Sequence, residues 1–187
     1  MATAELSRQV ARRRCLPKGL LRLWLHAYAA VWATTLLPAA VVWLIGGKLA
    51  ADVRRVFVRH RSPAPHVAHV LVLTAHNIPI VSWPLLLGLW GAHRHPRSTR
   101  IADALLLVCV IANAAPVGLE LGAYGTVLLP YLPNLPVEWA GMALGASGWL
   151  AQRRRALTVR EGLAMFALIA VVLLCAAVLE TAAVPHR

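Results

Sequence analysis

Five apolar stretches alternate with polar or proline-rich connections along the chain. They cover approximately residues 24–50, 67–90, 101–129, 137–150 and 161–183. A helix needs about 20 apolar residues to cross a bilayer once, so four of the stretches are long enough for single crossings. The stretch at 137–150 is short, so it is either half-inserted or extended by the prolyl turn before it. The pattern predicts an all-α, polytopic membrane protein with about five transmembrane helices in one domain, residues 24–185.

Prolines lie inside three of these stretches, at Pro38, Pro79, Pro84 and Pro116. A proline has no N–H, so it leaves the carbonyl four residues earlier without its helical donor. In the second stretch the freed carbonyls belong to Ala75 and Ile80, which lie beside His76 and Asn77. Polar groups at membrane depth must face protein or a water-filled cavity. We therefore expect Pro/Gly-broken spans, with a polar interior near His76 and Asn77.

The composition places most of the chain in lipid. Of its 187 residues, 59% are hydrophobic and only 14% are charged, with a mean hydropathy of +0.66. The net charge of +12 could suggest nucleic-acid binding, but the basic residues punctuate the apolar stretches and form no single stripe. We expect contact with anionic lipid at the basic loops and no nucleic-acid partner. The three cysteines form no C-x-x-C pair, so neither a disulfide framework nor a zinc ribbon is indicated.

The distribution of Lys and Arg predicts the orientation in the cell membrane, because basic loops favour the cytoplasmic side. The basic segments that we expect there are residues 1–23, 91–100 and 152–160. Residues 1–23 then form a cytoplasmic N-terminal segment, and the turn at 130–136 lies outside. Residues 51–66 do not fit, because their four arginines would also lie outside. Either residues 24–50 are not a simple span, or acidic groups of the protein hold this loop.

Carboxylates near the outer ends of three different spans indicate a polar site inside the membrane. Charged side chains in lipid are costly and usually turn towards protein or water. On the third span, Asn113 and Glu120 are seven residues apart and so share a helix face. We predict a polar intramembrane site made by Glu120, Glu138, Glu180, His76, Asn77 and Asn113.

Small residues next to these carboxylates indicate close helix packing, because glycine lets two helices approach in lipid. The predicted packing positions are Gly118, Gly122, Gly141, Gly145 and Gly148. Three of them follow Glu138 along one face of its helix, which would turn Glu138 towards a neighbouring helix and away from the acyl chains.

Three interpretations of the polar site remain open. Its groups are structural, pairing with one another, with freed carbonyls or with the arginines of residues 51–66. Alternatively, they line a proton or ion path, or a pocket for a cationic or peptide ligand. Thirdly, they bind a metal or perform acid–base catalysis. No H-E-x-x-H or H-x-x-x-H pattern and no Gly-rich phosphate loop occurs, so we expect no catalytic residue, metal or cofactor.

Short motifs resemble one known family. The segment P-N-L-P-V-E, Pro133–Glu138, resembles the P-H-G-x-x-E segment of the stage II sporulation protein M family of integral membrane proteins. Leu174–Pro185 is similar to that family's closing helix, and Thr74–Pro79 to its Asn-containing helix. The family's His and Gly are replaced here by Asn134 and Leu135.

The resemblance, which extends over about residues 20–185, implies a function that composition does not. It carries over Asn77, Glu138 and Glu180 as matching positions, whereas His76 replaces the first of the family's paired Asn residues. It implies a multi-span membrane scaffold that recruits envelope-remodelling proteins. Other relatives resemble membrane components of small-peptide systems, of the bacteriocin or ribosomal natural product type, which act in maturation, export or self-immunity. A protein partner in the membrane, and in the second case a small peptide, is expected.

Overall fold

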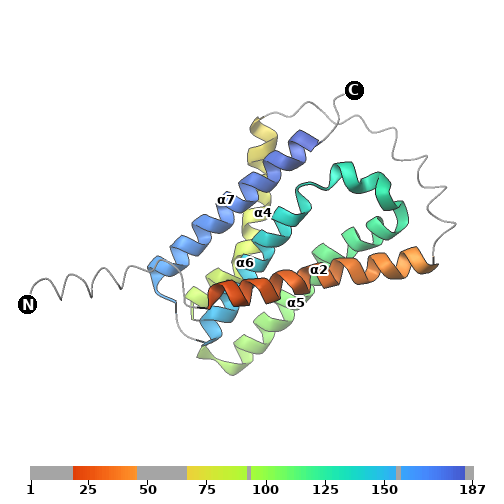
Figure 1. Ribbon diagram of the computed structural model, residues 1–187. Coiled ribbons are helices and arrows are strands. Elements are labelled where there is room, and N and C mark those ends of the chain that lie inside the picture. The colour runs from red at the N-terminus through yellow and green to blue at the C-terminus, as the bar shows by residue number, and fades with distance from the viewer. Residues whose placement is uncertain (1–18, 46–66, 92–93, 155–156, 184–187) are drawn as a thin grey trace, which may run out of the picture.

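The computed structural model describes residues 19–45, 67–91, 94–154 and 157–183, which are helical apart from short turns and connections (Figure 1). The helices are α2 (Leu20–Ile45), α4 (Val67–Leu89), α5 (Pro96–Tyr124), the 3₁₀ helix η2 (Gly125–Tyr131), α6 (Leu135–Arg154) and α7 (Val159–Ala183). No strand occurs within the described ranges. The predicted all-α class is therefore confirmed, while residues 1–18 and 46–66 lie outside the described part.

Four helices, α2, α4, α5 and α7, are long and apolar enough to cross a membrane. They contain between 23 and 29 residues, with mean hydropathies between 1.7 and 2.9 over their most apolar windows. Most of each such window faces outwards, with between 11% and 33% of it buried within the protein. Apolar side chains exposed in this number require lipid as the solvent. The protein is a multi-pass helical membrane protein.

Helix α6 differs from the other four and lies among them. It packs against α2, α4 and α7, and 13 of its 20 residues are buried, from Leu135 to Gln152. Its sequence is the least hydrophobic of the five α-helices, with Glu138 in its first turn and Arg153 and Arg154 in its last. The helix begins at Leu135, and Pro136 lies in its first turn. A proline is tolerated there because an N–H in the first turn has no helical acceptor.

The fourth stretch was predicted at about residues 137–150, either half-inserted or extended by the prolyl turn; the helix there is longer at both ends, and it is not among the helices that are long and apolar enough to cross a membrane. The helix includes Gln152 and the two arginines after it, which we had assigned to a loop. Its 20 residues correspond to a length of about 30 Å, enough for the hydrocarbon core of a bilayer. The expected turn at 130–136 contains the end of the 3₁₀ helix η2, a two-residue turn at Pro133 and Asn134, and the first two residues of α6.

The prolines interrupt hydrogen bonding inside the spans without ending the helices. Helix α4 continues through Pro79 and Pro84, and α2 and α5 each contain one internal proline. The Sγ atom of Cys109 on α5 lies 3.9 Å from the Ile80 carbonyl oxygen, to which it donates a weak hydrogen bond. This is the carbonyl that Pro84 frees. A neighbouring helix thus supplies the missing donor, which is how membrane helices tolerate proline.

Close helix crossings occur at the predicted glycines. A Cβ atom would collide with a backbone carbonyl oxygen at Gly118, Gly122 and Gly145. The oxygens belong to Thr35 and Ala39 of α2 and to Val81 of α4. Gly141 and Gly148 instead face side chains, with closest contacts of 3.1 and 3.0 Å for an added Cβ. Backbone therefore meets backbone where α5 crosses α2 and where α6 crosses α4.

The helices form two pairs on either side of α6, α2 with α5 and α4 with α7. The pairs diverge towards one end of the bundle, so α4 and α5 have little contact with each other (Figure 1). At the converging end, which we call the basic end, lie Arg94, Arg97, Arg100, Arg153, Arg154 and Arg160. The diverging end, the acidic end, carries His69, Glu120, Glu138 and Glu180 on four different helices.

Candidate functional site: a polar cleft between α4 and α5

A partly open cavity of about 180 Å³ lies between α4 and α5, with α6 as its floor. Three polar side chains line it, Asn77 from α4, Asn113 from α5 and Glu138 from α6. The rest of its wall is apolar and includes Ile80 and Val117. We refer to this cavity as the cleft. It brings together three of the six residues that we predicted for the polar site.

The position of the cleft follows from the way α4 and α5 diverge. The two helices approach each other at Ile80 and Cys109. Asn77 and Asn113 each lie about one turn from this contact, on the side of the acidic end, where the helices separate. Asn113 Nδ2 donates a hydrogen bond of 2.7 Å to the Cys109 carbonyl oxygen. Because its amide N–H is used within α5, Asn113 has its Oδ1 to offer to the cleft.

Glu138 is held at the start of α6 by Asn134. The Glu138 backbone N–H donates to the Asn134 carbonyl oxygen at 2.9 Å, and the Asn134 side chain hydrogen-bonds the Glu138 carboxylate. A carboxylate in a first helical turn also interacts favourably with the helix dipole. Asn134 is only 8% exposed, and its Oδ1 has no hydrogen-bond partner in the described part of the chain.

Glu180 and His69 extend the polar site beyond the cleft. Glu180 lies in the last turns of α7, close enough to Glu138 for the two carboxylates to repel each other. His69, near the start of α4, interacts electrostatically with Glu180. All the arginines in the described ranges lie elsewhere, six of them at the basic end and Arg22 in the first turn of α2. The described part of the acidic end therefore offers these carboxylates no Lys or Arg.

Trp139 is the aromatic residue that lines the cleft. It is 4% exposed and packs against α2 and α5 through its cluster of apolar neighbours. Its indole Nε1–H is buried without a hydrogen-bond acceptor among the described residues. An unpaired buried donor costs about 1–3 kcal/mol, so this group and the Asn134 Oδ1 are unusual features of one small region.

Two predicted site residues are not part of this arrangement. His76 is exposed, because it precedes Asn77 by one residue and so points about 100° away around α4. Glu120 is exposed as well. It shares a helix face with Asn113 but lies two turns nearer the acidic end, where α5 has separated from α4 (Figure 1).

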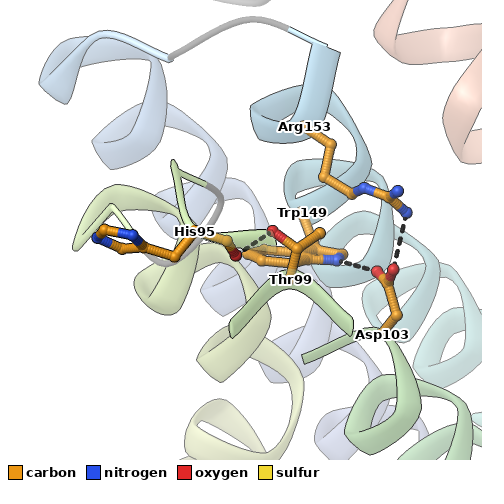
Figure 2. A network of polar contacts seen from close by, with 5 residues as sticks. All are labelled: His95, Thr99, Asp103, Trp149 and Arg153. Carbon is orange, nitrogen blue, oxygen red and sulfur yellow. Dashed lines mark hydrogen bonds and ion pairs between the residues drawn. The ribbon is translucent and has the colours of Figure 1, made fainter. Parts of the chain in front are cut away.

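A second polar network, which was not predicted from the sequence, lies at the basic end (Figure 2). The Trp149 indole Nε1–H donates to Asp103 Oδ1 at 2.8 Å, and Arg153 Nη1 lies 3.0 Å from Asp103 Oδ2. One turn before Asp103, Thr99 Oγ1 donates to the His95 carbonyl oxygen. The network joins α5 to α6. Asp103 could have indicated this network in the sequence, because a lone aspartate inside a predicted span needs a partner.

Other chemistry is sparse in the described residues. No group of three His, Cys, Asp or Glu side chains within them is placed to hold a metal ion. Cys109 and Cys175 are free thiols, one half-buried between α4 and α5 and one exposed on α7.

No protein-family model, curated protein or solved structure matches the chain. The class of protein is thus defined by its fold and site alone: a multi-pass helical membrane protein whose central helix α6 presents a carboxylate to a polar cleft.

Proposed function

We propose that the protein is a membrane scaffold without catalytic activity of its own, which binds a segment of a partner protein at the cleft between α4 and α5. The observation that carries this proposal is the convergence of Asn77, Asn113 and Glu138 on a partly open cavity. Polar groups at membrane depth gain most when another helix supplies their partners. A segment that enters the cleft and pairs with these groups would be held there.

The resemblance to the stage II sporulation protein M family supports partners that remodel the cell envelope. The proposed location is the cell membrane, with the N-terminus and the basic end in the cytoplasm. Six arginines at the basic end, of which only Arg153 forms an ion pair shown by the described residues, suit contact with anionic lipid headgroups.

A second candidate function is a membrane component of a small-peptide system, acting in maturation, export or self-immunity. The acidic end favours it, because Glu138 and Glu180 would attract a cationic peptide. The two functions share the cleft and differ in the partner.

Cross-linking in living cells tests the proposal. A diazirine-bearing amino acid at Val117, in the wall of the cleft, should capture a defined partner. The matched control places the same amino acid at Leu107, which is 61% exposed on the same helix. Capture of wall-remodelling proteins would support the scaffold, and capture of a short peptide, its transporter or its modifying enzyme would support the alternative. No adduct at Val117, or equal adducts at both positions, would contradict binding at the cleft.

A further inference from the structure

We propose that the cleft is a receptor for a single cationic group, an ammonium or a guanidinium, carried on an apolar chain that enters between α4 and α5. This inference rests on the proposed function, because it specifies what the partner presents to the cleft.

The charge of the site calls for a cation. Glu138 lines the cleft, and Glu180 is near enough to repel it. The only cationic or potentially cationic neighbour that interacts with either carboxylate in the described chain is His69, which acts on Glu180. A carboxylate removed from water is costly unless an opposite charge and hydrogen-bond donors accompany it. A ligand with one positive charge would supply both to Glu138.

Among the groups around Glu138, one buried acceptor lacks a donor and one buried donor, the Trp139 Nε1–H, lacks an acceptor. Asn134 Oδ1 is buried beside Glu138 without a donor, and Asn113 has committed its amide N–H to Cys109. An ammonium has three donors and a guanidinium has five, whereas a neutral hydroxyl has one. Trp139 also lines the cleft, and cations are attracted to aromatic rings.

The Trp139 Nε1–H indicates what kind of molecule bears the cationic group. This donor is buried without an acceptor, although the ring lines the cleft. A carbonyl oxygen of a bound ligand would supply the missing acceptor. A peptide offers a backbone carbonyl close to a cationic side chain or to its terminal ammonium, so one segment would satisfy both Trp139 and Glu138.

The size of the cleft limits the ligand to one group. Pockets for drug-sized molecules typically measure about 300–1,000 Å³. A cavity of about 180 Å³ accommodates one side chain and leaves the remainder of the ligand outside. The remainder would lie along the apolar helix surfaces around the opening, which is why we expect the cation on an apolar carrier.

Binding of a simple cationic amphiphile to the full-length protein tests the inference. The probe is n-dodecylamine, and n-dodecanol is the neutral control, with the protein in nanodiscs of zwitterionic lipid. We expect dodecylamine to bind and to raise the unfolding temperature, while dodecanol has no such effect. Glu138→Gln should weaken amine binding on the order of tenfold or more, because it removes a charge-assisted hydrogen bond. Glu120→Gln, which changes an exposed carboxylate at the same end, should bind like the parent protein.

Equal binding of amine and alcohol, or equal losses in the two glutamate variants, would overturn the inference. Asn113→Leu provides a second test that keeps Glu138, since it removes a polar group of the cleft at nearly constant volume and should also weaken amine binding. If the diazirine at Val117 captures a partner but dodecylamine neither binds nor competes, the scaffold proposal stands and the cation receptor fails. If the amine binds at the cleft but no partner is captured, the site chemistry stands and the scaffold proposal fails.

Discussion

At the scale of single residues, two carboxylates on neighbouring helices have opposite environments. Both oxygens of Asp103 are engaged, one by the Trp149 indole and one by Arg153. Glu138 has one amide partner and otherwise faces an open cleft. Asp103 therefore joins two helices, whereas Glu138 has hydrogen-bonding capacity left for a ligand.

Removing the Asp103 carboxylate should destabilise the fold through Trp149. Trp149 is fully buried, so Asp103→Ala leaves its indole N–H without an acceptor, at a cost of about 1–3 kcal/mol in the free energy of unfolding. Arg153→Gln removes only a half-exposed ion pair, whose loss typically costs about 0–1 kcal/mol. Unfolding of both variants in mixed micelles measures the difference. Equal destabilisation would show that the ion pair, and not the indole hydrogen bond, joins α5 to α6.

At the scale of helices, packing is decided by where backbone meets backbone. Each glycine of α6 faces a neighbouring helix, but only Gly145 faces a carbonyl oxygen, that of Val81. Gly141 faces the flexible end of Leu173. Two glycines one turn apart on one helix therefore differ in what a methyl group would displace.

Alanine at these two glycines should have different effects. Gly145→Ala pushes α6 away from α4, and overpacking of this kind costs about 1–3 kcal/mol. For Gly141→Ala the Leu173 side chain can move, and alanine gains about 1 kcal/mol of helix propensity, so we expect stability close to that of the parent protein. Thermal unfolding in detergent distinguishes the two. A Gly145→Ala protein as stable as the parent would mean that the α4–α6 crossing adjusts freely.

The start of α7 is fixed by a capping box. Thr158 and Glu161 bond reciprocally: Glu161 Oε2 accepts from the Thr158 N–H at 3.0 Å, and Thr158 Oγ1 accepts from the Glu161 N–H at 3.2 Å. Thr158→Ala should cost about 1 kcal/mol and speed up hydrogen exchange in the first turn of α7. Thr34→Ala is the control, because that hydroxyl donates only to the Ala30 carbonyl of its own helix. Unchanged exchange in α7 of the Thr158 variant would contradict a capping role.

At the scale of the whole molecule, the charges in the described ranges are segregated along the bundle. The arginines at the basic end lie where the two helix pairs converge, and Glu120, Glu138 and Glu180 lie where they diverge. Helix α2 is one helix of 26 residues parallel to α5, with its last residue, Ile45, towards the acidic end. By length and composition α2 could cross a membrane once, and residues 46–50 lie outside the described part of the chain.

The charge segregation predicts the orientation, because arginine-rich ends are retained in the cytoplasm. In a variant whose native cysteines are replaced, a cysteine at Thr126 in η2 should react with a membrane-impermeant maleimide in intact cells. A cysteine at Val159, which is 72% exposed at the basic end, should react only after permeabilisation. The reverse pattern would place the acidic end in the cytoplasm, and the proposed orientation would be wrong.

The sequence by itself determined which segments are helices in the membrane. Hydropathy over about 20 residues is a local property, and it decides whether a segment is more stable in lipid than in water. It also indicated that Asn77, Asn113 and Glu138 need an interior. Only the tertiary structure decided that these three meet in one cleft while His76 and Glu120 remain outside. That outcome depends on the angle at which α5 leaves α4 and on the central position of α6, which arise from packing between distant segments. No single span carries this information, because the face that a helix buries depends on its neighbours.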